Sequence, residues 1–287
     1  MPRLLILKGP PATGKTTFRA TLVEQGWKYT NLDELREAYP DYSEGDIHEL
    51  QRSMLFTYMA FGENIIIDNL NLNPKTTNRY ETYAVQFRYD VEYKLFGADL
   101  RWQGAMIRDH IRGLNGGRTV GKSVIIRSYM DAGLWKEPKR DAVIFDIDGT
   151  LADNTHRLHF LTDEEKKDWK SFHAHLHLDT VHTHVAILYD ALLNAEMEII
   201  LVSGRGEEYR KETEEWLRIH DFRDHFALFM RPFNNRNEDS LIKADIYERY
   251  IKPHFNVHFV VDDRPRVLRM WREKGLRTFD VGNGIEF

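Results

Sequence analysis

The stretch Asp141-Ala-Val-Ile-Phe-Asp-Ile-Asp-Gly-Thr-Leu151 decides the fold of the second half of the chain. Its apolar run, residues 142–145, is bounded by polar residues, which predicts a parallel strand covered on both faces. Asp146 and Asp148 follow at the carboxyl end of that strand, where open α/β sheets place their functional groups. Alternate residues of an extended segment point the same way, so the two carboxylates can share one divalent cation, and Gly149 lets the chain turn away. An Asp-Gly turn that closes a strand is the alternative, although it does not require an aspartate at position 146.

Two later apolar runs also end in polar residues. Residues 199–202 predict a strand that leads into Ser203-Gly-Arg205, and residues 258–261 predict another that leads into a pair of aspartates. The carboxyl ends of parallel strands meet at one edge of a sheet, so these groups are expected beside the first pair of carboxylates. Oxygen ligands suit Mg²⁺, which also keeps several waters. The predicted ligands of one Mg²⁺ are Asp146, the backbone carbonyl of Asp148, Asp262 and Asp263.

Asp146-Ile-Asp-Gly-Thr150 resembles the first motif of the haloacid-dehalogenase-like phosphatase superfamily. The resemblance implies that Asp146 is the nucleophile that takes the phosphoryl group and that Asp148 is the general acid and base. It also implies that Ser203 hydrogen-bonds a phosphoryl oxygen and that Arg205 contacts the substrate. Lys243, expected to begin a helix, would neutralise the nucleophile and the phosphate. A Ser-Gly turn and a solvated lysine are the alternatives at positions 203 and 243.

The composition of the chain excludes several classes of protein. At 287 residues the chain is long enough for two domains with separate cores, and its lack of cysteine excludes disulfides and thiolate metal sites. A net charge of −5 does not suggest a bulk nucleic-acid binder, so a polyanion site is expected to be a local basic groove. The opening apolar run is too short for a signal peptide, and no stretch approaches the roughly 20 apolar residues of a membrane span. We therefore expect a cytoplasmic protein without membrane contact.

The first motif of the chain is a phosphate-binding loop. Residues 4–7 predict a strand, Gly9-Pro-Pro-Ala-Thr-Gly-Lys-Thr16 fits the pattern G-x-x-x-x-G-K-[ST], and a helical pattern runs over residues 17–25. Backbone N–H groups would cradle the β-phosphate, Lys15 would neutralise the β- and γ-phosphates, and the Thr16 hydroxyl would hold Mg²⁺. A chance match is the alternative, which the flanking strand and helix disfavour. The predicted ATP-binding residues are Gly9, Ala12, Thr13, Gly14, Lys15, Thr16, Thr17 and Arg112.

A carboxylate and an arginine follow the second predicted strand, residues 28–30. Asp33 and Arg36 lie three apart at the start of a helix and therefore on one face. Asp33 can accept the proton of an attacking hydroxyl, and Arg36 can bind an anionic acceptor through two hydrogen bonds. On the residues alone, a helix N-terminal carboxylate with a solvated partner fits as well. The position at the end of a core strand, facing the phosphate-binding loop, favours catalysis.

Two further strands are predicted in this half, over residues 64–68 and 91–96. Asp68 ends the first of them. Its carboxylate is equally consistent with binding a Mg²⁺ water and with capping the next turn.

Basic residues gather between positions 101 and 140. Arg108 and Arg112 lie i,i+4 on one helical face, just before Gly113 and the glycine-rich residues 114–117. This is the layout of a lid that closes arginines over a transferring phosphoryl group. A solvated basic helix face is the alternative. Arg112 is the favoured lid arginine, and Arg118 is the reserve candidate.

In the order of its motifs the chain resembles phage-type polynucleotide kinase/phosphatase over nearly its whole length. The resemblance rests on residues 9–16, Asp33 with Arg36, residues 71–74, Arg108 with Arg112-Gly113, residues 127–129, 143–150 and 202–205, and Asp262-Asp-Arg264. It implies that Asp33 is the general base for a 5′-hydroxyl and that Arg36 contacts the 3′-phosphate of the acceptor. Lys15 and Arg112 would stabilise the transferred phosphoryl group, and the insertion at 114–117 departs from the pattern. The resemblance also implies RNA or DNA ends as partners, a homo-oligomer such as a tetramer and, for a phage-encoded protein, the host cytoplasm as location.

Residues 136–141 predict a polar, proline-bearing linker between the two halves. Residues 152 to about 182 predict an inserted cap over the phosphatase site, with a charged helix over residues 163–170 and a dense run of histidines. Alternating histidines can bind a metal, but the run lacks a second ligand pair of known spacing, so no zinc site is expected. A later helix over residues 207–220 is expected to pack Trp216 into the core.

The sequence thus predicts an α/β protein with two domains. Residues 1–135 would form a P-loop polynucleotide 5′-hydroxyl kinase, and residues 142–287 a haloacid-dehalogenase-like 3′-phosphatase, with Mg²⁺ as cofactor and ATP as phosphoryl donor. Together they would convert 5′-OH and 3′-phosphate ends to 5′-phosphate and 3′-OH ends. Two alternatives stay open: a metabolic small-molecule kinase fused to a small-molecule phosphatase, and a non-catalytic nucleic-acid-binding module. The complete acid, base and cation sets at both sites argue against the second.

Overall fold

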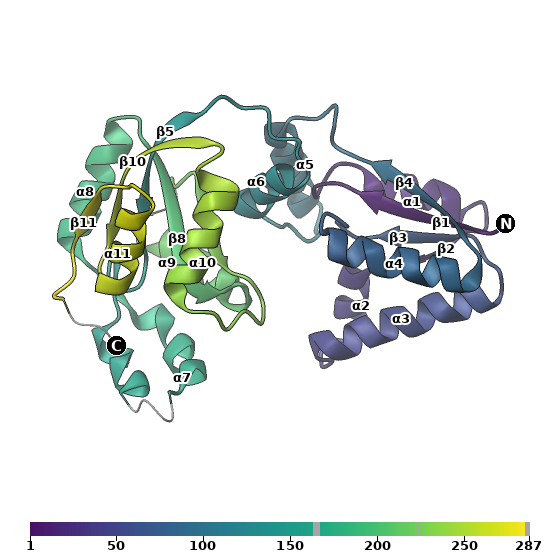
Figure 1. Cartoon of the computed structure of the whole chain (residues 1–287), viewed down its shortest axis with the longest axis horizontal. Helices are drawn as coiled ribbons and strands as arrows, with labels where there is room; N and C mark the ends of the chain where they lie inside the picture. Colours follow the sequence, from purple (N-terminus) through teal and green to yellow (C-terminus); the bar gives the residue numbers. More distant parts are fainter. Residues whose placement is uncertain (163–166, 223, 285–287) are drawn as a thin grey trace. The chain divides into compact units, whose positions relative to one another are not determined.

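A computed structural model describes residues 1–162, 167–222 and 224–284 of the chain (Figure 1). The chain folds into two compact units, Met1–Lys136 and Glu137–Phe287. Both units are mixed α/β structures built on parallel sheets. Residues 140 and 141, which the sequence analysis assigned to the linker, are the first two residues of a strand of the second unit.

The first unit is built on a four-stranded parallel sheet in the order β2-β3-β1-β4. Its strands are β1 (Arg3–Lys8), β2 (Lys28–Thr30), β3 (Ile65–Asp68) and β4 (Asp90–Leu95). The aliphatic runs of β1 and β3 are buried because helices cover both faces of these central strands. The four strands confirm those predicted from the sequence, with each end within one residue of its prediction.

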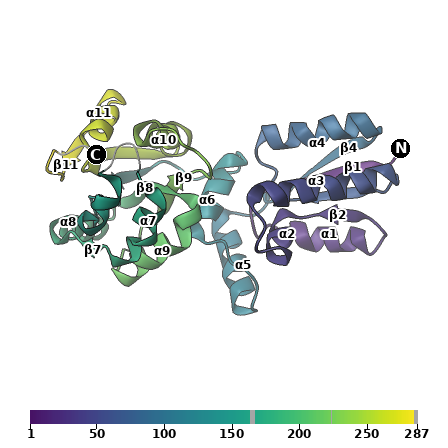
Figure 2. The same ribbon diagram turned by 90° about the horizontal axis from the view of Figure 1, so that it is seen from below.

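The helices of this unit are α1 (Lys15–Val23), α2 (Leu32–Ala38), α3 (Glu44–Ala60), α4 (Pro74–Phe87), α5 (Trp102–Leu114) and α6 (Lys122–Asp131). Helix α1 covers one face of the sheet and α3 and α4 cover the other, whereas α5 and α6 pack against each other (Figure 2). Leu4 and Ile6 of β1 point to one face, where they pack with Leu55 of α3 and Tyr80 of α4. The alternate residues of β1 point to the opposite face, where Phe18 and its neighbours on α1 cover them. The loop after β1 is therefore held at the carboxyl edge of a rigid sheet.

The second unit is built on a five-stranded parallel sheet in the order β11-β10-β5-β8-β9. Its strands are β5 (Arg140–Phe145), β8 (Glu198–Gly206), β9 (Ala227–Arg231), β10 (Phe255–Asp262) and β11 (Thr278–Asp280). The decisive apolar run, residues 142–145, is buried in the central strand, which confirms its prediction. The strands β9 and β11 were not predicted from the sequence.

The helices of this sheet are α8 (Thr183–Asn194), η3 (Glu207–Tyr209), α9 (Arg210–Ile219), α10 (Asp239–Ile246), η4 (Tyr247–Ile251) and α11 (Pro265–Glu273). Trp216 on α9 packs with Tyr189 of α8 and with β5 in the main core cluster, so the predicted core role of this helix is confirmed. Lys243 was predicted to begin a helix, which is wrong. It lies within α10, because Asp239 and Ser240 already form the first turn of that helix. None of the helices in the described ranges is long and apolar enough to cross a membrane.

An insertion lies between two short antiparallel strands, β6 (Ala152–Asp153) and β7 (Thr180–Val181), which pair and so close its base. It contains η1 (Thr155–Leu161), α7 (Trp169–Ala174) and η2 (Leu176–Leu178). The predicted helix over 163–170 falls partly on residues 163–166, which lie outside the described residues. Residues 167 and 168 are not helical, because the Asp168 side chain caps α7 by accepting a hydrogen bond from the N–H of Ser171 at 3.0 Å.

Candidate active sites

The loop between β1 and α1 has an anion-binding shape. Gly9 has φ +146°, and a Cβ placed there would lie 2.5 Å from the carbonyl oxygen of Phe96, so the backbone approaches more closely than a side chain allows. Gly14 has φ +95° and precedes α1, whose N-terminal N–H groups receive no side-chain cap from it. These groups are therefore available to oxygens of a phosphate.

Lys15 lies inside this loop. It is 8% exposed, and its Nζ donates hydrogen bonds to the carbonyl oxygens of Gly9 at 2.8 Å and Pro10 at 2.7 Å. Burial lowers the pKa of Lys15 to about 8. Asp33 raises this pKa and Arg112 lowers it, so the charges of both residues reach Lys15. The fold thus brings together three residues that the sequence analysis selected from distant positions.

A hydroxyl and a carboxylate meet beside the loop. The Thr16 Oγ1 donates to Asp68 Oδ2 at 3.4 Å, and Asp68 is 2% exposed at the end of β3. Arg19 Nη1 lies 3.2 Å from the same carboxylate. Burial raises the pKa of Asp68, although Arg19 and Lys15 act against this rise. Of the two interpretations left open for Asp68, its position against Thr16 favours the Mg²⁺ one.

Asp33 is placed by the cap of α2. The side chain of Asn31 accepts hydrogen bonds from the N–H groups of Asp33 and Glu34, and its Nδ2 donates to the carbonyl oxygen of Asp68 at 2.7 Å. The start of α2 is therefore tied to the end of β3. Asp33 Oδ1 lies 2.7 Å from Arg36 Nη1.

Both arginines near Asp33 have acidic partners. Arg36 Nε also donates to Glu44 of α3 at 2.7 Å, a partner that the sequence analysis missed. Arg118 Nη1 lies 3.4 Å from Asp33 Oδ1. The reserve lid arginine is thus beside the candidate base, whereas Arg108 lies near Tyr129.

The segment after α5 is held by a residue that was not predicted, Asp109. This side chain is 4% exposed on α5 and accepts hydrogen bonds from the N–H groups of Val120 at 3.0 Å and Gly121 at 3.1 Å. It also forms an ion pair with Arg112, one turn along the helix. Gly113, which follows the candidate lid arginine, lies within α5, which extends to Leu114. Asp109 therefore fixes both the candidate lid arginine and the loop that follows it.

The carboxylates of the second unit gather at the carboxyl edge of its sheet. Asp146 follows β5, and Asp262 and Asp263 stand at the end of β10. One oxygen of each lies within 4.8 Å of the others, and all three residues are buried. The fully buried Nζ of Lys243 lies 2.8 Å from Asp146 Oδ1 and 3.0 Å from Asp262 Oδ2. All four of these groups were predicted from the sequence, and the fold brings them together.

These residues fit a divalent cation. The ammonium group of Lys243 contacts two of the three carboxylates, Asp146 and Asp262, so the cluster holds more negative than positive charge. Burial raises the pKa of Asp146; the charge of Lys243 opposes this rise, and Asp262 and Asp263 add to it. Burial and Asp262 raise the pKa of Asp263 to about 6. A hard cation with oxygen ligands, such as Mg²⁺, would remove this repulsion.

Gly149 leaves space for one of these carboxylates. Its φ is +81°, and a Cβ placed there would lie 2.1 Å from Asp263 Oδ2. The Thr150 Oγ1 donates to Asp263 Oδ1 at 3.1 Å. The glycine and threonine of the first motif therefore position the last carboxylate of the cluster.

Asp148 lies between two buried guanidinium groups. Arg205 donates to it from Nε and Nη2, both at 2.8 Å, and Arg157 of the cap forms a short ion pair with it. Burial alone would raise the pKa of Asp148, but the charges of Arg205 and Arg157 outweigh it and hold the pKa far below its usual range. The buried Asp179 pairs with the same two arginines, at 2.6 Å and 3.0 Å. Ser203, 0% exposed, accepts a hydrogen bond from the N–H of Arg205 at 3.1 Å.

Sequence reasoning missed Arg157, Asp179 and Asp239. Asp239 Oδ2 lies 3.5 Å from Lys243 Nζ and 3.6 Å from Arg264 Nη1. The four-residue spacing of Asp239 and Lys243 on a helix was a usable signal for this pair. Arg157 and Asp179 stand at opposite ends of the cap without any regular spacing, so only the pairing of β6 with β7 brings them together.

Several histidines of the cap contact the main chain. Ring nitrogens of His175, His177 and His182 lie 2.8–3.1 Å from the carbonyl oxygens of Ser171, Ala174 and Thr150. Among the described residues, the metal-type cluster is that of the three aspartates.

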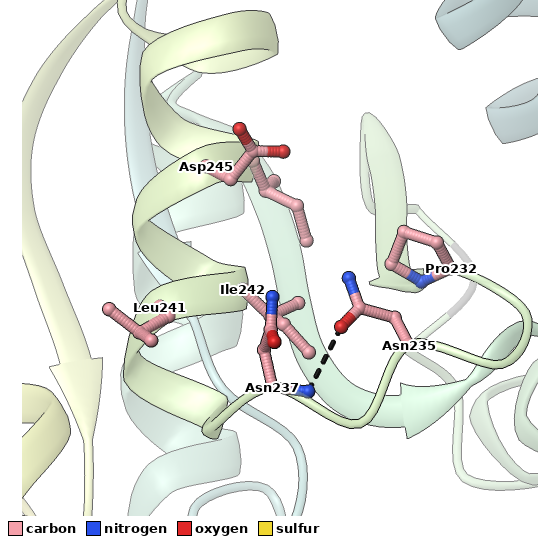
Figure 3. Close-up of a pocket in the computed structure, with 7 residues that line it drawn as sticks. Pro232, Asn235, Asn237, Leu241, Ile242 and Asp245 are labelled. Atoms are coloured by element: carbon pink, nitrogen blue, oxygen red, sulfur yellow. Dashed lines mark hydrogen bonds between the residues drawn. The ribbon is translucent and has the colours of Figure 1, made fainter.

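A hollow of about 280 Å³ lies beside α10 (Figure 3). It is lined by Pro232, Asn235, Asn237, Leu241, Ile242, Asp245 and Ile246. Asn235 Oδ1 accepts a hydrogen bond from the N–H of Asn237 at 3.0 Å, which folds the loop against the helix. None of the candidate site residues lines this hollow, so we do not assign it to the site.

Residues 140–285 match the family described as polynucleotide kinase PNKP phosphatase domain. A curated relative, "Putative bifunctional polynucleotide kinase/RNA ligase" of Autographa californica nuclear polyhedrosis virus, is 26% identical over 303 residues, which cover 96% of this chain and 42% of that protein. The chain thus spans less than half the length of this relative.

Two similar solved structures are those of the Pnkp1/Rnl/Hen1 RNA repair complex and of the Pnkp1/Rnl/Hen1 complex. The first is 25% identical, covers 99% of this chain and 97% of that chain, and has a TM-score of 0.44. The second is 24% identical, covers 99% and 98%, and has the same TM-score of 0.44.

Proposed function

The chain belongs to the family of polynucleotide kinase PNKP phosphatase domains, and on that premise we propose that it repairs nucleic-acid ends with two activities. A P-loop kinase in the first unit transfers the γ-phosphoryl group of ATP to a 5′-hydroxyl end. A haloacid-dehalogenase-like phosphatase in the second unit removes a 3′-phosphate. The observation that carries the proposal is the buried cluster of Asp146, Asp262 and Asp263 with Lys243, within the residues that match the family.

The phosphatase reaction follows from this cluster. An Asp146 oxygen attacks phosphorus, the bond from phosphorus to the 3′-oxygen breaks, and an aspartyl-phosphate forms. Asp146, Asp262, Asp263 and the Asp148 carbonyl would hold Mg²⁺, which would supply the positive charge that lets a carboxylate approach a phosphate dianion. Lys243 holds Asp146 in place and shares its charge. Ser203 offers a hydroxyl to a phosphoryl oxygen.

Asp148 handles the protons. Arg205 and Arg157 hold it ionised, and an incoming phosphate competes for the same two guanidiniums. When they turn to the phosphate, their charges no longer hold the pKa of Asp148 down, so its carboxylate takes a proton from water and gives that proton to the leaving 3′-oxygen. A water then attacks the aspartyl-phosphate while Asp148 takes a proton from it, which releases phosphate and restores Asp146.

The kinase reaction uses the first unit in the same way. The loop N–H groups and Lys15 would hold the β- and γ-phosphates, and the Thr16 hydroxyl would hold Mg²⁺. Asp33 accepts the proton of the 5′-hydroxyl while the hydroxyl oxygen bonds to the γ-phosphorus and ADP leaves. Arg36 contacts the 3′-phosphate of the acceptor, and Arg112 stabilises the transferring group.

The partners proposed are RNA or DNA ends, in the cytoplasm, with the chain assembled as a homo-oligomer. The metabolic fusion enzyme is the second candidate, because the exposed Asp33 and the half-buried Arg36 could also serve a nucleoside acceptor.

An oligonucleotide with a 5′-hydroxyl and a 3′-phosphate tests both activities at once. The intact protein, with Mg²⁺ and γ-labelled ATP, is expected to label the 5′ end and to release the 3′-phosphate. Asp33→Ala should lose only labelling, and Asp146→Asn should lose only phosphate release. The exposed residues Asp41 and Asp190 give matched controls, since their asparagine variants should keep both activities. Reaction of 3′-nucleoside monophosphates without any reaction of RNA or DNA oligonucleotides would instead establish the metabolic fusion.

A further inference from the structure

Three aromatic rings form a column beside Asp148. The ring of His173 on α7 stacks on that of Tyr209 of η3, with centroids 4.5 Å apart and an interplanar angle of 29°. On the same helix, the ring of Trp169 is nearly parallel to that of His173, at 25°, with centroids 6.0 Å apart. The column therefore joins the cap to the segment that follows β8.

Short contacts tie both ends of this column to the guanidiniums that flank Asp148. Phe172, next to His173, accepts a hydrogen bond from Arg157 Nη1 at its carbonyl oxygen, at 3.3 Å, and its ring lies 4.0 Å from the Arg157 Cζ. The carbonyl oxygen of Tyr209 accepts a hydrogen bond from Thr213 Oγ1 at 2.8 Å. The same hydroxyl accepts one from Arg205 Nη1 at 3.4 Å. The column is thus fixed relative to the phosphoryl-binding groups.

His173 is uncharged in this setting. Burial lowers the pKa of its imidazole to about 4, and although Asp148 opposes this shift, the charges of Arg157 and Arg205 add to it. At neutral pH the column is a set of neutral rings. Such rings stack on any nucleobase, because every base has a π-face.

Core packing alone does not explain the column. Trp169 is 47% exposed, whereas the rings that build the core of this unit, such as Trp216, are buried. His173 Nδ1 is buried, and no group in the described part of the chain lies within hydrogen-bonding distance of it. The exposed ring of Trp169 is therefore available to a stacked ligand, and the unpaired Nδ1 shows that His173 is not placed there by a hydrogen bond of that atom.

We propose that the Trp169–His173–Tyr209 column is the subsite for the nucleobase of the 3′-terminal nucleotide. The base stacks on the exposed ring of Trp169, which His173 and Tyr209 support from below. The proposal rests on the 3′-phosphatase function and adds a specificity element to it. It explains how the site takes a nucleic-acid end in preference to a small phosphate ester without reading its sequence.

The experiment compares two 3′-phosphorylated oligonucleotides on the intact chain, one complete and one with an abasic 3′-terminal nucleotide. For the complete oligonucleotide, Trp169→Ala should lower kcat/KM roughly 5- to 150-fold, the range expected from one lost base stack. Removing the base should have the same effect on the unchanged protein. Trp169→Ala should then have no further effect on the abasic oligonucleotide, and Trp169→Phe should restore most of the loss on the complete one.

Two further variants separate binding from structure. Tyr209→Ala should follow the same pattern as Trp169→Ala. His177→Ala, which removes an exposed histidine of the same cap, should leave both substrates unaffected. Equal losses on both oligonucleotides in the Trp169 and Tyr209 variants, or no loss on either, would overturn the subsite. If the unchanged protein releases phosphate from neither oligonucleotide, the 3′-phosphatase function itself fails, which is a distinct result.

Discussion

Replacing Asp179 by asparagine tests the charge balance of the cap. Asp179 and Asp148 are the carboxylates paired with Arg157 and Arg205, and the side chains of Asp179 and both arginines are 0% exposed. Arg157 donates to Asp179 from both Nε and Nη2 at 2.6 Å. Asp179→Asn keeps the volume of the side chain but leaves one positive charge of the pair of arginines without a buried partner.

The expected loss of stability follows from this burial. Removing one partner of a buried ion pair destabilises a protein by about 3–5 kcal/mol, because the remaining charge stays desolvated. For a domain of this size, each kcal/mol lowers the melting temperature by about 2–4 °C, so the second unit should melt on the order of 10 °C lower. Phosphatase activity should fall as well, because the same arginines face Asp148.

Differential scanning calorimetry of the intact chain measures this effect. The transition of the second unit should move, while that of the first unit and the kinase activity should stay unchanged. Glu215→Gln is the matched control, because it removes a carboxylate from an exposed ion pair with Arg218 and should leave both transitions in place. If Asp179→Asn has the same melting temperature and phosphatase activity as the unchanged protein, Asp179 is not needed to balance the charges of the two buried arginines, and the reasoning is refuted.

Three further predictions concern the two sites. Asp109→Ala frees Arg112, so it should lower kinase kcat on the order of 10- to 100-fold and leave phosphatase activity intact, as separate assays on one sample can check. Gly149→Ala should abolish phosphatase activity, because its Cβ would displace Asp263. The control is Gly275→Ala, where φ is +84° but the added Cβ meets nothing; this variant should keep phosphatase activity and lower only the melting temperature, through backbone strain. A chelator should stop phosphate release, and added Mg²⁺ should restore it; full activity in the chelator would contradict a metal role for the three carboxylates.

The sequence predicted those features that are local in the chain. The strand before Asp146 was predicted because four apolar residues lead directly into the carboxylates, and the loop before Lys15 was predicted because its glycines have fixed spacing. The strands β9 and β11 were not predicted. No recognisable motif follows β9, so nothing in the sequence marked the end of that strand. These strands are defined by their neighbours in the sheet rather than by a pattern of their own.

The groups that surround the predicted residues could not be found in this way. Arg157 and Asp179 meet because β6 pairs with β7, and Glu44 reaches Arg36 from the start of another helix. No spacing rule connects such residues, since each pair is brought together by tertiary structure. Asp109 is an intermediate case, because its contact with Arg112 is local but its contacts with the loop are not.

The two sites differ in how their charges are balanced. In the first unit, Asp33 is near Arg36 and Arg118, so an incoming anion must exchange places with carboxylates that the arginines already contact. In the second unit, the three aspartates around Lys243 keep an excess of negative charge that a cation can neutralise. A net charge of −5 hides both arrangements, because it sums the charges of the whole chain. The local balance of charge, rather than the total, therefore determines which ligand each site attracts.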